Sequence, residues 1–161
     1  MSPVKMTASD LLAFLRGYPH AVQASVTPGG APQAAVVGVA VTDSLELVFD
    51  TLGRTRKASN LRHAPRIAFV VGGDQATVQY EGVADEPSGA ELTCLKRIYF
   101  ERFPERRRRE SPADLTYFRT RPSWIRYTGF RGGRLEIVEW SGADLSRATP
   151  LGRAVRAAAA D

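Results

Sequence analysis

The sequence predicts a mainly β, α+β fold, in which six or seven antiparallel strands form a barrel with peripheral helices. Short β-rich runs follow one another through tight turns, and helical patterns occur only near residues 10, 60 and 95. A doubly wound parallel sheet would need a helix after most strands. With 161 residues and 43% hydrophobic side chains, the chain is long enough for one domain with a substantial core.

The N-terminal part contains one predicted helix and three predicted strands. Thr7 and Asp10 have the spacing of a capping box ahead of an apolar helical run, and Gly17 ends that helix. Strands are predicted at residues 21–26, 33–41 and 45–49. The run at 33–41 contains no charge or break, which is typical of a strand buried on both faces.

The remaining chain alternates helix and strand signals. A short helix is predicted to begin at Thr55 and to stop before Pro65, and a longer one covers residues 87–103. Glu81-Gly82 interrupts an alternating pattern, which indicates a β-bulge. Residues 105–121 are interpreted as a charged excursion. Strands are predicted at residues 66–71, 76–85, 123–129 and 134–139.

We assign residues 1–142 to one domain and residues 143–161 to a tail that is helical or frayed. No apolar run approaches the ~18 residues of a membrane helix, and the N-terminus lacks the apolar region of a signal peptide. A cytoplasmic protein without a membrane partner is therefore expected. The single cysteine, Cys94, is interpreted as a packing residue, and the two histidines do not stand at metal-ligand spacing.

The net charge of +5 is concentrated in four consecutive arginines at residues 106–109. Such a run is usually a solvated loop, and nonspecific contact with nucleic acid is the alternative. No aromatic side chains interleave with the arginines, which disfavours nucleic-acid binding.

The most informative stretch for function is the start of the short helix. Thr55, Arg56 and Lys57 bring two cations and unpaired backbone N–H groups together, which favours phosphate binding. Two cations at a helix N-terminus oppose its dipole and cost roughly 0.3–1 kcal/mol each unless an anion is bound. A solvated helix start is the alternative. Neither a Rossmann nor a P-loop glycine motif is present.

Around this helix the sequence resembles the flavin-binding split barrels related to pyridoxamine 5′-phosphate oxidase, over roughly residues 7–142. The matching residues are Thr51, Thr55-Arg56-Lys57, Asn60-Leu61, Pro65-Arg66-Ile67, Glu81-Gly82 and, as an I-x-x-W-x-G pattern, Ile137-Val138-Glu139-Trp140-Ser141-Gly142. The resemblance implies an antiparallel split β-barrel, an FMN cofactor and a homodimer with the cofactor at its interface.

The resemblance also implies roles for individual positions. Arg56 and Lys57 would hold the FMN phosphate, Thr55 would assist them, and Thr51 would hydrogen-bond near the ribityl chain or the flavin edge. The flavin ring would lie along a strand, against backbone groups of Ala34, Ala35, Val36 and Val37.

Three further positions are implied near the flavin. The glutamine that reaches the cofactor from the partner subunit in this family corresponds here to the neighbourhood of Thr77 and Gln79. Trp140 would lie near the flavin across the interface, or it is a core aromatic.

One departure from the family pattern concerns the substrate. The true oxidase follows W-x-G with an R-L-H-D-R-like segment that grips the pyridoxal substrate. Here residues 143–147 read ADLSR, without the histidine, so only Arg147 remains. The sequence is therefore similar to a divergent member that acts on another, unknown small molecule.

The preferred hypothesis is an FMN-dependent oxidoreductase in which the flavin supplies the redox chemistry. The alternatives are an F420-dependent reductase on the same barrel, a non-catalytic flavin-binding or haem-binding protein, and a nucleic-acid-binding barrel. No catalytic residue is assigned. The candidates for lining the pocket are Tyr80, Arg126, Tyr127 and Trp140.

Overall fold

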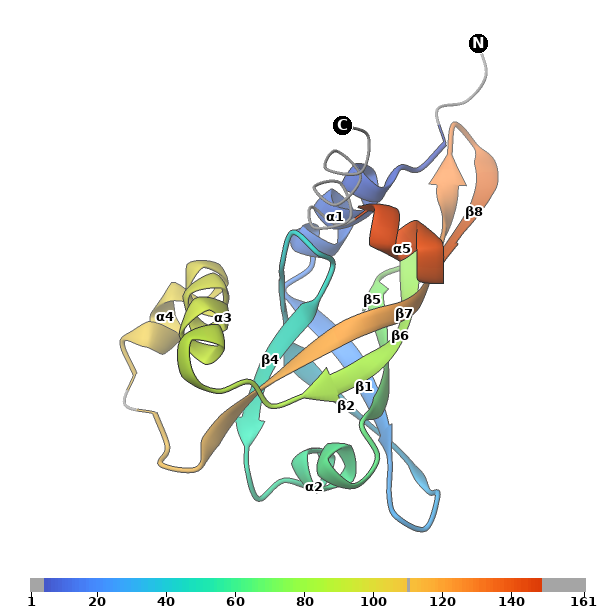
Figure 1. The fold of residues 1–161 in the computed structure, drawn as a ribbon. Helices are drawn as coiled ribbons and strands as arrows, with labels where there is room; N and C mark the ends of the chain where they lie inside the picture. The colour runs from blue at the N-terminus through green and yellow to red at the C-terminus, as the bar shows by residue number, and fades with distance from the viewer. Residues whose placement is uncertain (1–4, 110, 149–161) are drawn as a thin grey trace, which may run out of the picture.

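The computed structural model describes residues 5–109 and 111–148. Within these ranges one eight-stranded antiparallel sheet curls into a half-barrel, and helices lie at its ends and on one side (Figure 1). The mainly β barrel predicted from the sequence is confirmed. None of the described helices is long and apolar enough to cross a membrane.

The elements follow one another along the chain in an order close to the predicted one. They are α1 (Ala8–Gly17), β1 (His20–Val26), β2 (Pro32–Gly38), β3 (Ala40–Val41), β4 (Leu47–Leu52), α2 (Arg56–His63), β5 (Arg66–Gly72), β6 (Ala76–Asp85), α3 (Gly89–Arg102), α4 (Pro104–Arg107), β7 (Leu115–Arg131), β8 (Arg134–Ser141) and α5 (Gly142–Ala148). The strands are ordered β2-β1-β5-β6-β7-β4-β3 across the sheet, and β8 pairs with β7.

The predicted strand at residues 33–41 is two strands that lie at opposite edges of the sheet. The chain bends at Val39, whose N–H donates to the carbonyl of Pro19 at 2.9 Å, so β2 pairs with β1 whereas β3 pairs with β4. The expected burial on both faces is wrong for β2, because Val36 is 67% exposed. Because the chain bends at Val39, β2 does not pair with β4. The gap between these two strands is the split in the barrel.

Strand β7 begins well before the position predicted for it. Residues from Leu115 onward, interpreted as part of a charged excursion, pair with β4 from Leu52↔Leu115 to Leu47↔Thr120. The same strand then pairs with β6 and β8, so it joins the two halves of the sheet. The bulge predicted at Glu81-Gly82 is confirmed by a register shift between β6 and β7. A Cβ at Gly82 would lie 2.3 Å from the carbonyl oxygen of Arg121, which explains the glycine.

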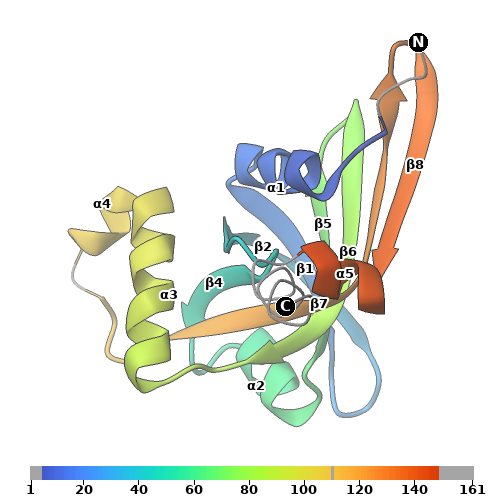
Figure 2. The same cartoon turned by 45° about the horizontal axis from the view of Figure 1, so that its top comes forward.

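Two hydrophobic clusters hold the fold together. The larger one fills the barrel and includes Phe49, which stacks on Phe118 and meets Phe69 edge to face. The smaller one lies between the outside of the sheet and α3, around Val48 and Tyr99. Helices α3 and α4 therefore cover only one part of the outer surface of the barrel (Figures 1 and 2).

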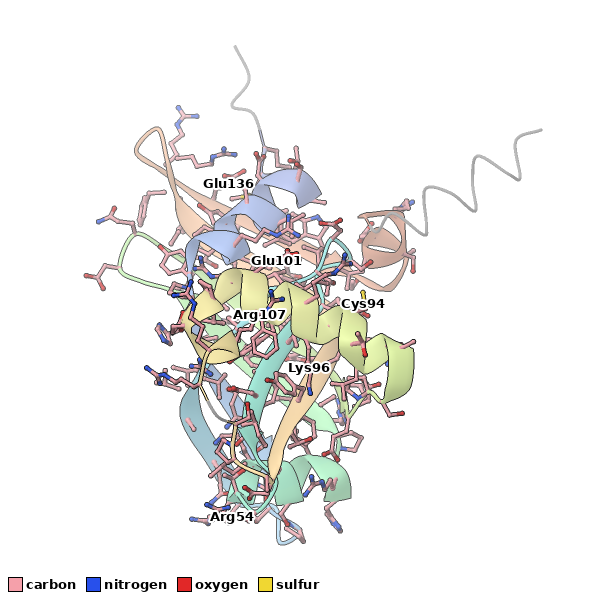
Figure 3. All side chains as sticks on the ribbon, turned by 90° about the vertical axis from the view of Figure 1, so that its left-hand side faces the viewer. Arg54, Cys94, Lys96, Glu101, Arg107 and Glu136 are labelled. Atoms are coloured by element: carbon pink, nitrogen blue, oxygen red, sulfur yellow. The ribbon has the colours of Figure 1, made fainter. Side chains whose placement is uncertain are left out.

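Two expectations for single elements change. Cys94 was interpreted as a packing residue, but it is exposed on α3 (Figure 3), because the buried stripe of this helix runs through Leu95 and Tyr99. The start of the predicted tail is helix α5, and Leu145 of this helix is buried in the barrel cluster. Residues 149–161 of the predicted tail lie outside the described part of the chain.

Candidate functional site

Helix α2 begins directly after β4, at the lower end of the barrel in Figure 1. Thr55 is its N-cap and accepts a hydrogen bond from the N–H of Ala58 at 3.4 Å. Arg56 and Lys57 occupy the first turn, which contains no acidic residue. The predicted helix start is confirmed. Its positive dipole end lies beside two cations, so the local electrostatics favour an anion.

Lys57 reaches back from α2 to strand β4. Its Nζ donates to Oγ1 of Thr51 at 3.3 Å, and the same oxygen lies 3.0 Å from Oγ1 of Thr55. Thr51 is 8% exposed and lies on the side of β4 that faces the barrel. No carboxylate pairs with Lys57 among the described residues. Two hydroxyls and one ammonium group therefore meet at the base of the split.

Arg56 is held from the opposite side, by strand β2. With the Gln33 amide oriented to accept from the guanidinium, Gln33 Oε1 lies 2.7 Å from Nε and 2.9 Å from Nη1 of Arg56. The other end of the Gln33 amide lies 2.8 Å from Nδ2 of buried Asn60. This Nδ2 also donates to Oγ of Ser25 at 3.1 Å. The sequence reasoning missed Gln33, whose signal is a polar side chain within an apolar strand.

We call Thr51, Thr55, Arg56 and Lys57 the α2 clamp. One of its cations is tied to β2 and the other to β4, so the clamp spans the split of the barrel. A phosphate placed there would accept from hydroxyls, from both cations and from free N–H groups of α2.

Strand β2 presents an unpaired edge beside the α2 clamp. Among the described strands it pairs only with β1, so one row of its backbone groups has no strand partner. The four positions predicted to line the flavin ring belong to this strand. Backbone N–H and C=O groups of an edge strand are available for a ligand. The side chains are small or apolar, and the positions are Ala34, Ala35, Val36 and Val37.

An ion pair fixes α2 in place. Arg62 donates to both carboxylate oxygens of Glu86, at 2.8 and 2.6 Å, and to the carbonyl of Gly53 at 2.7 Å. The hydrogen bond from Arg62 lowers the pKa of Glu86 below its ordinary value. The arginine thus joins α2 to the turn before it and to the segment after β6.

Three other predicted residues lie on the outer face of the sheet, away from the clamp. Gln79 pairs across the sheet with Val70 on one side and Arg126 on the other, and Thr77 lies one step further along β6. Arg126 forms an ion pair with Glu139 at 3.2 Å. Within one chain the structure does not bring these side chains to α2.

Three predicted aromatic residues belong to the core. Trp140 is 8% exposed and packs in the barrel cluster, so the core interpretation accounts for it. Tyr80 is fully buried, its hydroxyl donates to the carbonyls of Leu45 and Thr120, and burial raises its pKa. Tyr127 packs edge to face on Phe14. The expectation that these side chains line a pocket is wrong for Tyr80 and Tyr127.

The arginine run at residues 106–109 is only partly a solvated loop. Arg106 lies in α4 and donates to Asp50 at 2.7 Å and to the hydroxyl of Tyr99 at 2.5 Å. Burial and the neighbouring Asp50 raise the pKa of Tyr99. Asp50 lies in β4, one residue beyond the strand predicted at residues 45–49, and its side chain points away from that of Thr51. This pair attaches α4 to the barrel.

The chain is thus a split barrel in which two cations and two hydroxyls, the α2 clamp, lie beside an open strand edge. The family model of pyridoxamine 5'-phosphate oxidase matches residues 9–129. The chain therefore belongs to this family. No curated protein matches the sequence.

Several solved structures share the fold at low sequence identity. A haem-binding protein from Mycobacterium smegmatis has a TM-score of 0.75 at 19% identity, covering 88% of this chain and 61% of its own. A putative pyridoxamine 5'-phosphate oxidase from Listeria innocua has a TM-score of 0.63 at 20% identity, covering 74% and 96%. The haem storage protein HutZ from Vibrio cholerae has a TM-score of 0.64 at 18% identity, covering 74% and 92%.

The chain spans 61% of the Mycobacterium smegmatis protein and 59% of the protein Atu2129, of unknown function, from Agrobacterium tumefaciens, whose structure has a TM-score of 0.68 at 20% identity. These identities show the fold and nothing finer.

Proposed function

We propose that this protein binds FMN through the α2 clamp and acts as an FMN-dependent oxidoreductase on a small molecule. The observation that carries the proposal is the pair Arg56 and Lys57, which flank the split without a carboxylate partner among the described residues. Two cations in the first turn of a helix oppose its dipole, which is unfavourable unless an anion balances them. A flavin phosphate supplies that anion.

The donor set of the clamp fits a phosphate monoester. Arg56 offers a planar fork, Lys57 a compact charge, and Thr51 and Thr55 hydroxyls that rotate to suit the oxygens. The unpaired edge of β2 supports placement of a flat, hydrogen-bonding ring beside it. Bound FMN would supply hydride or electron transfer, while the chain binds and orients it.

The proposal includes a homodimer. The outer face of the sheet outside α3 and α4 carries every large hydrophobic side chain that is exposed in the described chain. These residues are Val22, Val26, Val36, Val70, Val83, Phe130, Leu135 and Ile137. An apolar surface of this kind is typical of a protein interface. Thr77 and Gln79 lie on the same face, so a second copy would bring them toward the cofactor of the first.

The test of the cofactor is its identification in the purified protein. We expect a yellow protein with flavin absorbance near ~450 nm that releases FMN on denaturation. We also expect a nicotinamide or another reductant to bleach this absorbance. Release of F420 in place of FMN would keep the phosphate site and change the cofactor. A protein that takes up neither would contradict the proposal.

Haem binding is the second candidate. It is favoured because similar structures are described as haem-binding or haem-storage proteins and because His20 is exposed on the uncovered outer face. A neutral imidazole is a usual haem ligand. Titration with hemin tests it: tight binding that is lost in His20→Ala, without any flavin uptake, would favour a haem-binding protein.

A further inference from the structure

Helices α3 and α4, with the two residues that follow them, concentrate positive charge that the fold does not neutralise. Most of the lysines and arginines that form no ion pair among the described residues lie in this part of the chain. They are Lys96, Arg97, Arg102, Arg107, Arg108 and Arg109. Lys96 is half-buried, and the arginines are exposed. We call these side chains the α3–α4 patch.

The carboxylates of the same helices cancel little of this charge. Glu91 is paired at 2.6 Å with a buried arginine of β7, and Glu105 lies 4.0 Å from Arg106. Glu101 is exposed and has no ion-pair partner in the part of the chain that the structure describes. It lies on the opposite side of α3 from Lys96 (Figure 3). The patch is therefore positive overall.

Two cations of the patch are held in place by aromatic rings. Nζ of Lys96 lies 5.2 Å from the ring centre of Tyr117, and the guanidinium of Arg107 lies 5.5 Å from the ring centre of Phe100. The two rings meet edge to face at 6.3 Å. Because each ring restricts the motion of its cation, less side-chain entropy is lost when the cation meets an anion. Lys96 and Arg107 therefore form the positioned centre of the patch.

The patch rests on a fixed support and carries no apolar surface. Leu95, Tyr99 and Phe103 bury the inner side of α3 against the sheet, and Arg106 attaches α4 to Asp50 at 2.7 Å. The large hydrophobic side chains that are exposed in the described chain all lie on strands. A partner of this surface is therefore recognised by its charge.

Arginine and the length of α3 favour a polyanion with closely spaced phosphates. A guanidinium group matches two phosphate oxygens at once. The 14 residues of α3 span roughly 21 Å, and a nucleic-acid duplex carries one negative charge per roughly 1.7 Å of its axis. Several cations of the patch can therefore meet phosphates together. A helix that inserts into a membrane surface exposes its apolar side, whereas that side of α3 is buried.

The aromatic residues of this region favour a duplex over a single strand. A single strand is bound mainly by stacking of its bases on free aromatic faces. Tyr99 and Phe103 are buried. The rings of Phe100 and Tyr117 already lie against cations. The lack of aromatic residues at positions 106–109 likewise disfavours stacking, but it has no bearing on phosphate contacts to a duplex.

We propose that the α3–α4 patch binds the phosphate backbone of a nucleic-acid duplex without regard to sequence. The inference goes beyond the proposed function and depends neither on the cofactor nor on the homodimer. The surface assigned to the dimer lies outside α3 and α4, so each copy keeps its patch exposed.

Fluorescence anisotropy of a labelled DNA duplex of mixed sequence measures the binding. The logarithm of the association constant is expected to fall with the logarithm of the salt concentration at a slope of roughly −3 to −5, because each neutralised phosphate contributes about −0.9. The same sequence as a single strand should bind more weakly. A duplex that is not bound at low salt, or a single strand that is bound more tightly, overturns the inference.

A double charge reversal locates the binding surface. Lys96→Glu/Arg107→Glu is expected to weaken duplex binding at least about tenfold and to make the salt slope shallower by roughly 2, because two phosphate contacts are lost. Lys5→Glu/Arg134→Glu is the matched control. It changes the net charge equally at exposed cations that precede α1 and begin β8, and that form no ion pair among the described residues. Equal losses in the two variants show that only net charge matters and overturn the patch.

A second variant and a second surface complete the test. Arg108→Glu/Arg109→Glu should weaken duplex binding in the same direction, and it replaces the first variant if thermal unfolding shows that the first does not fold. Binding to vesicles of anionic lipid without any duplex binding, lost in Lys96→Glu/Arg107→Glu, assigns the patch to a membrane and overturns the inference. FMN titration of the same variants is read independently, so failure here leaves the proposed function unchanged.

Discussion

Arg119 and Arg56 are two arginines of the same barrel in opposite situations. Arg119 is 5% exposed and donates to Asp85 at 3.0 Å through Nε and to Glu91 at 2.6 Å through Nη1. Arg56 is exposed at the start of α2, where no acidic residue occupies the first turn, and an uncharged amide holds it. The first cation is neutralised within the chain and connects elements. The second cation is held in position, but no carboxylate neutralises it. A cation that binds an anionic ligand needs both properties.

The same contrast holds for their neighbours. Arg106 is paired with Asp50, and Arg121 lies near Glu46 and Asp85. Among the residues that the structure describes, Lys57 donates only to a hydroxyl, that of Thr51. The distinction between structural and ligand-binding cations therefore lies in the charge of the partners and is independent of the number of contacts.

The largest expected effect is on the structural side of the comparison. Arg119→Ala removes the side chain that joins β7 to Asp85 and α3, and we expect it to lower the free energy of unfolding by on the order of 2–3 kcal/mol. Both carboxylates are partly exposed and can turn to water, which keeps the loss below that of a fully buried pair. Urea unfolding measures it, with Arg102→Ala on α3 as the control.

If Arg119→Ala proves neutral, the ion pairs at β7 do not stabilise the fold, and pairing no longer separates the two kinds of arginine. If it weakens FMN binding without loss of stability, Arg119 belongs to the ligand side.

Gln33→Ala tests the positioning of Arg56. Removing the amide frees the guanidinium from β2, and we expect FMN to bind about threefold more weakly, because the hydrogen bonds that orient this cation are lost. Gln75→Ala, at an exposed position in the β5–β6 turn, is the matched control. Calorimetric titration gives both affinities. An unchanged affinity in Gln33→Ala would show that Arg56 does not need this contact.

The smallest expected effect concerns pH. Arg62 lowers the pKa of Glu86 in the folded state, so the ion pair stabilises the fold above the ordinary value of 4.5 and loses its effect as the pH falls through the lowered value. The pair is partly exposed, and we expect it to contribute below about 1 kcal/mol. Glu86→Gln should flatten the acid limb of the stability curve by that amount.

Thermal unfolding between pH 3 and pH 7 is the measurement for Glu86. Glu101→Gln on α3 is its control. An acid limb that is identical in the wild type and in Glu86→Gln would show that the Arg62–Glu86 pair does not stabilise the fold.

Local signals predicted the start of α2 well. The hydroxyl of Thr55 and the break at Pro65 act within a few residues, as does the bulge at Glu81-Gly82. The family resemblance implied a split barrel, but the division of the run at residues 33–41 into β2 and β3 was not predicted, because the bend at Val39 depends on which strands β2 and β3 meet. The first part of β7 was missed for the same reason. The charged residues before it gave no strand pattern, and its partner strand, β4, lies about 65 residues earlier in the chain.

The candidate site divides in the same way. The α2 clamp residues all lie between positions 51 and 57, so their chemistry could be recognised in the sequence. Gln33 meets Arg56 and Asn60 only after β2 folds against α2, and no local pattern indicates that contact. Tyr80 and Tyr127 have the composition of pocket residues, but alternation along β6 and β7 directs them into the core.

The central claim is that the α2 clamp recognises a phosphate. The most direct measurement compares FMN with riboflavin, which lacks the phosphate, on the wild type and on Arg56→Ala/Lys57→Ala by calorimetric titration. We predict that the wild type binds FMN at least about tenfold more tightly than riboflavin, and that the double variant loses this preference while its affinity for riboflavin stays the same. Equal affinities for the two ligands in the wild type, or a preference for FMN that survives in the double variant, would contradict the claim.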